Sequence, residues 1–134
     1  MLLHDLFEKK ETKRTAWVIA YTPDKIIMGK RAPGVNNPNQ WNFFGGNIDV
    51  GEDAATAAAR EMEEEIGVKA KPSDLKQVAS IDGATYFLYK IVSGFSPKKT
   101  AETSQIKGFK ITNLPDNMHS KTAAFFSDLE NLFQ

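Results

Sequence analysis

The closest spacing of acidic residues in the chain lies between Glu61 and Glu65, where four of five positions are glutamate. On a helix, Glu61, Glu64 and Glu65 share one side at spacings of i, i+3 and i+4, whereas Glu63 points away. Like charges at i and i+4 cost roughly 0.2–0.5 kcal/mol per pair. Carboxylate oxygens are the ligands that Mg²⁺ prefers beside phosphates. The run therefore indicates a metal site for phosphate chemistry or a solvated acidic face.

A helix that begins after Asp53 would position these carboxylates. Asp53 is a favoured N-cap residue, the run from Ala54 to Ala59 is rich in strong helix formers, and Gly67 is typical of a helix end. At about 100° per residue one stripe of this helix is apolar and should face the core. Its members are Ala55, Ala58, Ala59, Met62 and Ile66.

A pair of glycines, Gly45 and Gly46, follows the strand-like run Trp41–Phe44. Paired glycines at the end of a strand predict a close backbone approach or a positive φ angle. A bare backbone carbonyl beside a carboxylate-bearing helix could serve as a further metal ligand. The glycines therefore favour the metal-site interpretation of the acidic run.

The stretch from Gly46 to Val68 resembles the Nudix box. That pattern is glycine, five residues, glutamate, seven residues, and then Arg-Glu-apolar-any-Glu-Glu-any-Gly-apolar, and all nine defined positions are filled here. Phe44 stands where many relatives have proline. The resemblance implies an α/β (α+β) fold, an α/β/α sandwich with a mixed β-sheet between helices.

The resemblance also implies roles for the residues that match the box. Mg²⁺, with Mn²⁺ as a substitute, would be bound by the Gly45 carbonyl and by Glu61, Glu64 and Glu65. Arg60 would orient the glutamates, with Glu64 and Glu65 taking part in catalysis. Gly46 and Glu52 would support the loop and the helix start. The chemistry would be metal-assisted attack of water on a phosphoanhydride.

The general base is left open between two regions of the chain. Some members of the family use a glutamate far downstream of the box, and Glu102 is the candidate here. It precedes Gly108–Ile111 and Leu114-Pro115, which resembles a common run in the family, although Phe109 stands where tryptophan is frequent. Glu102 could equally be an exposed loop residue, and Glu64 or Glu65 could supply the base instead.

Candidate substrate-binding residues lie outside the box. Lys30 and Arg31, beside a polar loop that runs to Asn39, could hold phosphates. Trp41, Phe43 and Tyr86 could stack on a base, although core packing explains aromatic residues on strands as well. Asn113 and Asn117 could contact a base edge or simply form turns. His4 and His119 have no metal-ligand spacing and receive no role.

Size and composition place limits on the function. The 134 residues predict one domain, residues 1–134. Seventeen basic and seventeen acidic residues give no net field for nucleic acid or membranes. The chain has no cysteine and no apolar run of membrane length, and residues 1–10, a short helix or an arm, lack the apolar centre of a signal peptide. We expect a cytoplasmic protein, either monomeric or homodimeric.

Hydrophobic patterning predicts strands over 15–21, 26–28, 41–44, 75–81 and 84–92, an extended segment over 102–111 and a second helix over 120–133. Residues 22–25 and 82–83 should form turns, with loops over 29–39 and 69–74. Ala123, Phe126, Leu129 and Phe133 should line the inner face of the second helix. This order of elements is compatible with a mixed sheet between helices.

The favoured substrate is a small nucleotide. The compact size and the run Gly29–Ala32 resemble members that convert a (d)NTP, including an oxidised one such as 8-oxo-dGTP, to NMP and pyrophosphate. Dinucleoside polyphosphates, nucleotide sugars and RNA 5′ ends are alternatives. Tyr86 matches a mark of some dinucleoside-polyphosphate hydrolases, whereas Gly83 stands where ADP-ribose hydrolases have proline. A nucleotide sensor without turnover is the alternative from another class.

Overall fold

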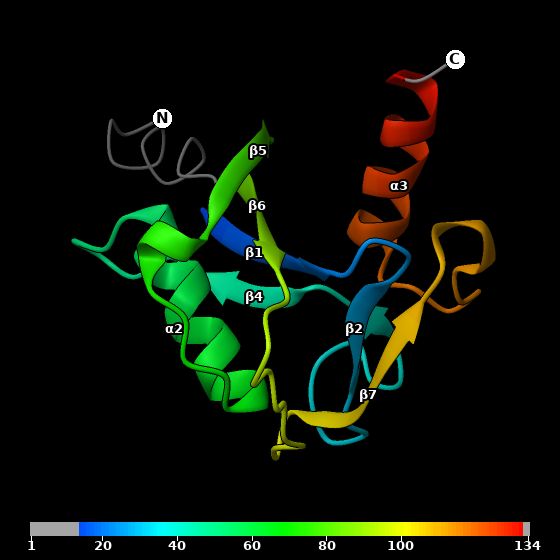
Figure 1. Cartoon of the computed structure of the whole chain (residues 1–134), viewed down its shortest axis with the longest axis horizontal. Helices are drawn as coiled ribbons and strands as arrows, with labels where there is room; N and C mark the ends of the chain where they lie inside the picture. The colour runs from blue at the N-terminus through cyan, green and yellow to red at the C-terminus, as the bar shows by residue number, and fades with distance from the viewer. Residues whose placement is uncertain (1–13, 133–134) are drawn as a thin grey trace, which may run out of the picture.

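The computed structural model describes residues 14–132, with side chains described up to residue 128. The expected helix or arm over residues 1–10 lies outside this range. Seven strands form one sheet, and two helices pack against it (Figure 1). The strands are β1 (Thr15–Tyr21), β2 (Ile26–Arg31), β3 (Trp41–Asn42), β4 (Phe44–Asn47), β5 (Lys76–Ile81), β6 (Ala84–Lys90) and β7 (Thr103–Phe109). The helices are α2 (Ala54–Ile66) and α3 (Ser120–Leu132), with 3₁₀ turns over Pro72–Asp74 and Ile111–Asn113.

Strand β1 is the centre of the sheet and has three partners. It runs parallel to β6 along its whole length, from the Thr15–Ala84 pair to the Tyr21–Lys90 pair. Its first half pairs antiparallel with β4, and only its last two residues pair with β2. β7 pairs antiparallel with β2 on the other side. The sheet is therefore mixed, as predicted, and β1 exchanges β4 for β2 halfway along its length.

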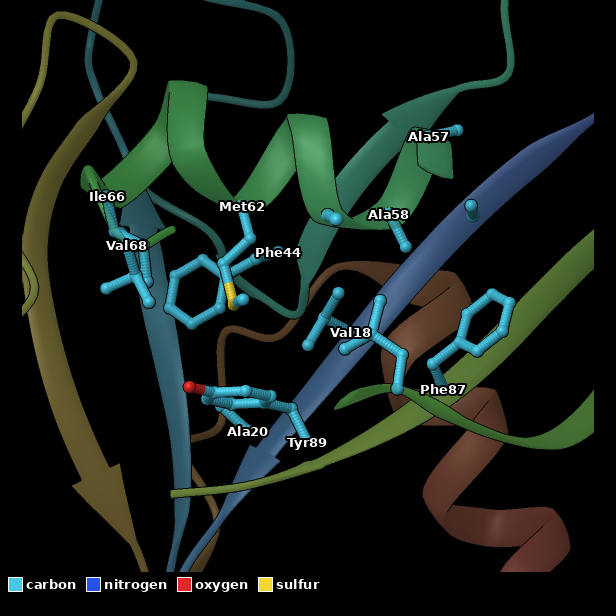
Figure 2. Close-up of a cluster of buried hydrophobic side chains, with 13 residues drawn as sticks. Val18, Ala20, Phe44, Ala57, Ala58, Met62, Ile66, Val68, Phe87 and Tyr89 are labelled. Atoms are coloured by element: carbon cyan, nitrogen blue, oxygen red, sulfur yellow. The ribbon is translucent and has the colours of Figure 1, made fainter. Parts of the chain in front are cut away.

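One face of the sheet packs against α2 (Figure 2). Val18 and Ala20 of β1 and Phe87 and Tyr89 of β6 point toward this helix, because residues two apart share a face of a strand. The helix contributes four residues of the predicted apolar stripe, Ala58, Ala59, Met62 and Ile66, all of them buried. Ala55 is only partly buried, and Ala57 takes a fully buried place that the prediction missed.

The opposite face packs against α3, so the two described helices sandwich the sheet as predicted. Ile19 and Met28 of the sheet meet Phe125 and Phe126 of the helix. The predicted inner face of α3 is wrong in detail, because Ala123 is exposed. Phe126 is buried as predicted, and the other buried positions are Thr122 and Phe125, while the side chains of Leu129 and Phe133 lie outside the described part.

Local interactions explain where the elements depart from the prediction. The expected strand 41–44 is broken at Phe43, whose N–H donates to Oδ1 of Asn42 (2.8 Å) instead of to a neighbouring strand. β2 continues to Arg31 because β7 and β3 pair with it there, so part of the expected loop is strand. The β5–β6 hairpin turns at Asp82-Gly83 as predicted, with φ angles of 49° and 81° that suit a type I′ turn.

Candidate active site

Helix α2 is fixed at both ends by the predicted residues. Asp53 is the N-cap, and its side chain accepts the N–H of Thr56 (2.8 Å). Gly67 ends the helix in the left-handed conformation (φ 71°), with its N–H donating to Glu63 O. Because the apolar stripe packs on β1 and β4, the adjoining side of the helix presents Glu61 and Glu65 to the glycines of β4.

Glu65 is held under strand β4. Its side chain is buried, and its Oε2 accepts the N–H of Gly45 (2.8 Å). A Cβ at Gly45 would lie 2.2 Å from Ala16 O of the paired strand β1, so only glycine allows β4 to lie this close to β1 here. Burial raises the pKa of Glu65 well above its usual range, and the negative charges of Glu61 and Glu102 raise it further, whereas the Gly45 N–H opposes the shift.

Glu61 lies beside the second glycine of β4. A Cβ at Gly46 would lie 2.8 Å from the Glu61 carboxyl group, so a side chain at this position would displace that carboxyl group. Burial raises the pKa of Glu61, although Arg60 opposes the shift, and the charges of Glu64 and Glu102 add to it. Glu61 and Glu65 are therefore two carboxylates that favour a proton or a cation.

Arg60 bonds to three carboxylates, one of which is Glu61. We call this group the arginine cluster; its members are Glu52, Arg60, Glu61 and Glu64. The guanidinium donates to both oxygens of Glu52 (2.8 and 3.0 Å), to Glu61 (3.1 Å) and to Glu64 (3.3 Å). It also donates to Asn47 O (3.1 Å), which attaches the helix to the end of β4. These bonds and the Asp49 N–H lower the pKa of Glu52 to about 2.

A polar cleft of about 570 Å³ opens beside the glycines, and we call it the acidic cleft. Glu61, Glu65 and Glu102 line it together with Arg31. Glu102 comes from the segment before β7 and is brought there because Ala32 N–H donates to its carbonyl (2.9 Å). The cleft is lined by Thr15, Trp17, Arg31, Gly34, Val35, Asn36, Asn37, Asn42, Gly45, Gly46, Asn47, Glu61, Glu65, Glu102 and His119.

The donor set of the acidic cleft suits a hard divalent cation. Three carboxylates share the cleft with one arginine, and two of them have raised pKa values because of burial and mutual repulsion. As placed, no three Asp, Glu or His side chains within the described part of the chain converge on one metal position. Further oxygens, from the Gly45 carbonyl or from a phosphate, would therefore have to complete the coordination of an ion bound by Glu61 and Glu65.

Several predicted site residues lie apart from this cleft. Glu64 does not line it, and its exposed carboxylate accepts from Arg60 instead. Lys30 does not line it either, because Arg31 is the residue of β2 that reaches the cleft and neighbouring strand residues face opposite sides. Asn113 and Asn117 are exposed residues outside it, and Asn117 donates to Asn39 O (2.7 Å).

The three aromatic residues predicted to bind substrate belong to the core on the α3 face. Phe43 packs edge-on against Phe125 (5.5 Å between ring centroids), and Tyr86 stacks on the same ring at 4.6 Å. Trp41 makes an edge contact with Phe109 at 4.9 Å. All three predicted residues are buried and none lines the acidic cleft, so we assign them to packing.

Three residues of the cleft received no role from the sequence. Trp17 lies half-buried beside Gly45, Asn42 is buried at the start of the broken strand, and His119 precedes α3. The pKa of His119 is lowered by burial and by the positive charges of Lys121 and Arg31. An isolated Asn or His produces no periodic pattern, and the buried strand around Trp17 is apolar on both faces, so sequence patterning alone does not place these residues at the cleft.

Comparison with curated proteins finds partial relatives. The chain is 54% identical over 45 residues to an RNA pyrophosphohydrolase of Rhodospirillum rubrum, covering 34% of this chain and 26% of that protein. It is 32% identical over 88 residues to an 8-oxo-dGTP diphosphatase of Haemophilus influenzae, covering 66% of this chain and 62% of that protein. The matched part thus spans between about a quarter and three fifths of the length of these two relatives.

Solved structures share the fold. A MutT NUDIX hydrolase of Burkholderia pseudomallei has a TM-score of 0.71 at 21% identity, with 86% of this chain and 95% of that chain covered. An Ap4A hydrolase of C. elegans has a TM-score of 0.67 at 16% identity, with 90% and 98% covered. No helix in the described part of the chain has the length and apolar character of a membrane span. The NUDIX domain family model matches residues 11–129, and the chain belongs to this family.

Proposed function

We propose that the chain hydrolyses a phosphoanhydride bond of a nucleoside diphosphate derivative, with Mg²⁺ as the metal and Mn²⁺ as a substitute. The favoured substrate is a (d)NTP, including an oxidised one such as 8-oxo-dGTP, which would give NMP and pyrophosphate. The observation that carries this proposal is the gathering of Glu61, Glu65 and Glu102 with Arg31 around two close-packed glycines. Three carboxylates in one cleft, one of them buried, would repel a nucleotide unless a cation neutralised them.

Each residue has a role that follows from its position. Glu61, Glu65 and the Gly45 carbonyl would hold the metal, which supplies charge neutralisation on phosphate oxygens and a more acidic water. Arg31 would bind a phosphate oxygen through its guanidinium. Glu102 would accept the proton of the attacking water as a P–O bond forms and the bridging P–O bond breaks. Pyrophosphate would leave with the electron pair of the broken bond.

In this proposal Arg60 and Glu52 do not contact the substrate; they act by positioning the metal-binding carboxylates. Arg60 would hold the Glu61 carboxylate at the rim of the cleft and support Glu52 and Glu64 on the same side chain. We also propose Glu64 as a metal ligand. To reach the cleft, its carboxylate would have to break its bond to Arg60. Rotation about its side-chain bonds is enough for this, because Glu64 is exposed.

RNA with a 5′-triphosphate is the second candidate substrate, because three of the partial relatives are RNA pyrophosphohydrolases. The chemistry at the phosphates would be the same. An RNA substrate adds phosphodiester contacts, so its KM should rise with salt more steeply than the KM of a free nucleotide. A salt series on both substrates would separate the two candidates.

The test is Mg²⁺-dependent hydrolysis across a panel of nucleoside triphosphates, 8-oxo-dGTP, dinucleoside polyphosphates, nucleotide sugars and 5′-triphosphorylated RNA. Products are separated by chromatography, and Glu64→Gln is compared with its neighbour Glu63→Gln. Release of NMP and pyrophosphate, lost in Glu64→Gln and kept in Glu63→Gln, is the expected result. Nucleotide binding without turnover on any substrate would reject the enzyme in favour of a sensor.

A further inference from the structure

We propose that Asn42 and His119 form a pair of fixed hydrogen-bond donors that selects a 6-oxopurine base, such as guanine, in the acidic cleft. This inference rests on the proposed function, because it concerns the nucleotide bound there. Both side chains line the cleft, and they are neighbours in space because the His119 N–H donates to Trp41 O (2.8 Å) beside Asn42. Each is held in its donor orientation by contacts outside the cleft.

The orientation of the Asn42 amide is fixed by two donors. Its Oδ1 accepts the backbone N–H of Phe43 (2.8 Å) and the hydroxyl of Thr122. A backbone N–H can only donate, so the oxygen must occupy this position and Nδ2 must occupy the other. The side chain is 6% exposed and, among the described residues, nothing accepts from Nδ2. Asn42 therefore presents N–H groups to the cleft.

The tautomer of His119 is fixed in a similar way. Its Nδ1 accepts the backbone N–H of Lys121 (3.2 Å) at the first turn of α3. A neutral ring whose Nδ1 accepts carries its proton on Nε2, and the lowered pKa of this histidine agrees with the neutral form. His119 thus adds a second donor, Nε2–H, on the wall of the same cleft.

The donors could bind a base or a phosphate, and the presence of Trp17 in the same cleft favours a base. The Trp17 Nε1 donates to the Thr15 hydroxyl (2.9 Å), which leaves the half-buried ring as an apolar surface in an otherwise polar cleft. A flat apolar surface suits stacking of a base. Gly45 is three residues from Asn42, at most about 10 Å away, so a nucleotide can reach from the carboxylates to the donors.

The chemistry of the base edges gives the selectivity. Guanine presents two neighbouring acceptors, N7 and O6, whereas adenine presents N7 and an amino donor. Two fixed donors satisfy the first edge and leave an unfavourable donor–donor contact with the second, and also with 8-oxoguanine, whose N7 carries a hydrogen. The pair therefore favours guanine over 8-oxoguanine among the proposed (d)NTP substrates. Hypoxanthine has the same N7 and O6 edge as guanine without the 2-amino group, so it separates reading of this edge from reading of the amino group.

The test is calorimetric binding of GDP, IDP and ADP with Mg²⁺ present. The wild type should bind GDP and IDP about 10- to 100-fold more tightly than ADP. Asn42→Asp keeps an oxygen for Phe43 and Thr122 but replaces the donor with an acceptor, and should reduce or invert this ratio. His119→Ser keeps a helix cap and removes the donor, and should also reduce it. Asn113→Asp, outside the cleft, should leave the ratio unchanged.

Two outcomes would overturn the inference. The wild type could bind GDP and ADP with equal affinity, or both variants could weaken GDP and ADP by the same factor, which would assign the donors to phosphate or to the fold. Hydrolysis measured on the same protein separates the two proposals. A preference for guanine without hydrolysis would reject the proposed enzymatic function and keep the proposed base selectivity. Hydrolysis without a base preference would reject the base selectivity and keep the enzymatic function.

Discussion

Two groups of carboxylates meet on helix α2 and differ in what balances their charge. In the arginine cluster, the guanidinium of Arg60 bonds to Glu52, Glu61 and Glu64, and the pKa of Glu52 falls to about 2. In the acidic cleft, the buried Glu65 has one backbone N–H as its partner, and its pKa is raised. The residues are of one type, and Glu61, Glu64 and Glu65 lie within about one turn of α2, whereas Glu52 lies just before the helix.

The difference shows that side-chain neighbours, not residue type, decide which carboxylates can take a cation. Glu52 is already neutralised by a fixed partner, so a metal would gain little there. Glu65 is buried with one backbone N–H as its partner, and Glu61 has only a share of Arg60, which also bonds to the rest of its cluster. A metal would relieve both desolvation and repulsion at these two carboxylates. We therefore propose that the unbalanced charge beside the glycines marks the end of the cleft where a metal binds.

The largest expected effect on hydrolysis comes from removing the charge of Glu65. Glu65→Gln should lower hydrolysis on the order of 10³-fold, because it removes a charged ligand of the metal. It should also stabilise the metal-free fold at neutral pH, because it removes the cost of holding an ionisable carboxyl group in a buried site. Steady-state kinetics and urea unfolding measure the two effects. Glu63→Gln is the matched control, and parallel loss of activity and stability in Glu65→Gln would contradict the comparison.

Glu102 tests whether the cleft also contains the base. Glu102→Gln should lower kcat by about 10²-fold with a small change in KM, since a base acts in the chemical step. A rise in KM with kcat unchanged would instead assign Glu102 to binding.

A smaller loss of activity is expected from a substitution in the arginine cluster. Arg60→Lys keeps the charge but cannot form the forked bonds to Glu52 and Glu61, so kcat/KM should fall about 10- to 100-fold through misplacement of Glu61. Thermal unfolding should occur at a lower temperature than in the wild type. Arg14→Lys, at an exposed arginine, is the control. Wild-type kinetics in Arg60→Lys would show that the cluster does not position the cleft.

The smallest effect concerns acid stability. The folded-state pKa of Glu52 is lowered to about 2, so its contribution to stability is present above the usual pKa of 4.5 and is lost as pH falls from there toward 2. Glu52→Gln should therefore flatten the dependence of the unfolding free energy on pH in this window. Denaturant curves at pH 2.5, 3.5 and 5.5 measure it. An unchanged slope would mean that Glu52 keeps its partner in the unfolded chain.

Much of the site could be predicted from local sequence. Asp53 and Gly67 bound α2 as expected because capping depends on near neighbours. The close approach at Gly45 and Gly46 also agrees with the expectation from paired glycines, and Glu102 reaches the same cleft as Glu61 and Glu65. These features depend on short spacings or on one distinctive motif.

The lining of the pocket depends on three-dimensional context and could not be predicted in this way. Both faces of the sheet are covered, so strand residues are apolar on both sides and their pattern does not tell which ring meets the cleft. Trp17 lines the cleft, whereas Trp41, Phe43 and Tyr86, the rings suggested by the sequence, are buried in the core. His119 is 77 residues from Asn42 in the chain, and only the packing of α3 brings the two together.

The most direct test of the central claim, that a divalent cation balances the acidic cleft, is a titration of thermal unfolding with Mg²⁺ at pH 6 and pH 8. A raised Glu65 pKa stabilises the metal-free fold below the usual pKa, and this is lost as pH rises through the raised value. Mg²⁺ should therefore raise the wild-type Tm, more at pH 8 than at pH 6, and should raise that of Glu65→Gln far less. A wild-type Tm that does not respond to Mg²⁺ at either pH would contradict the claim.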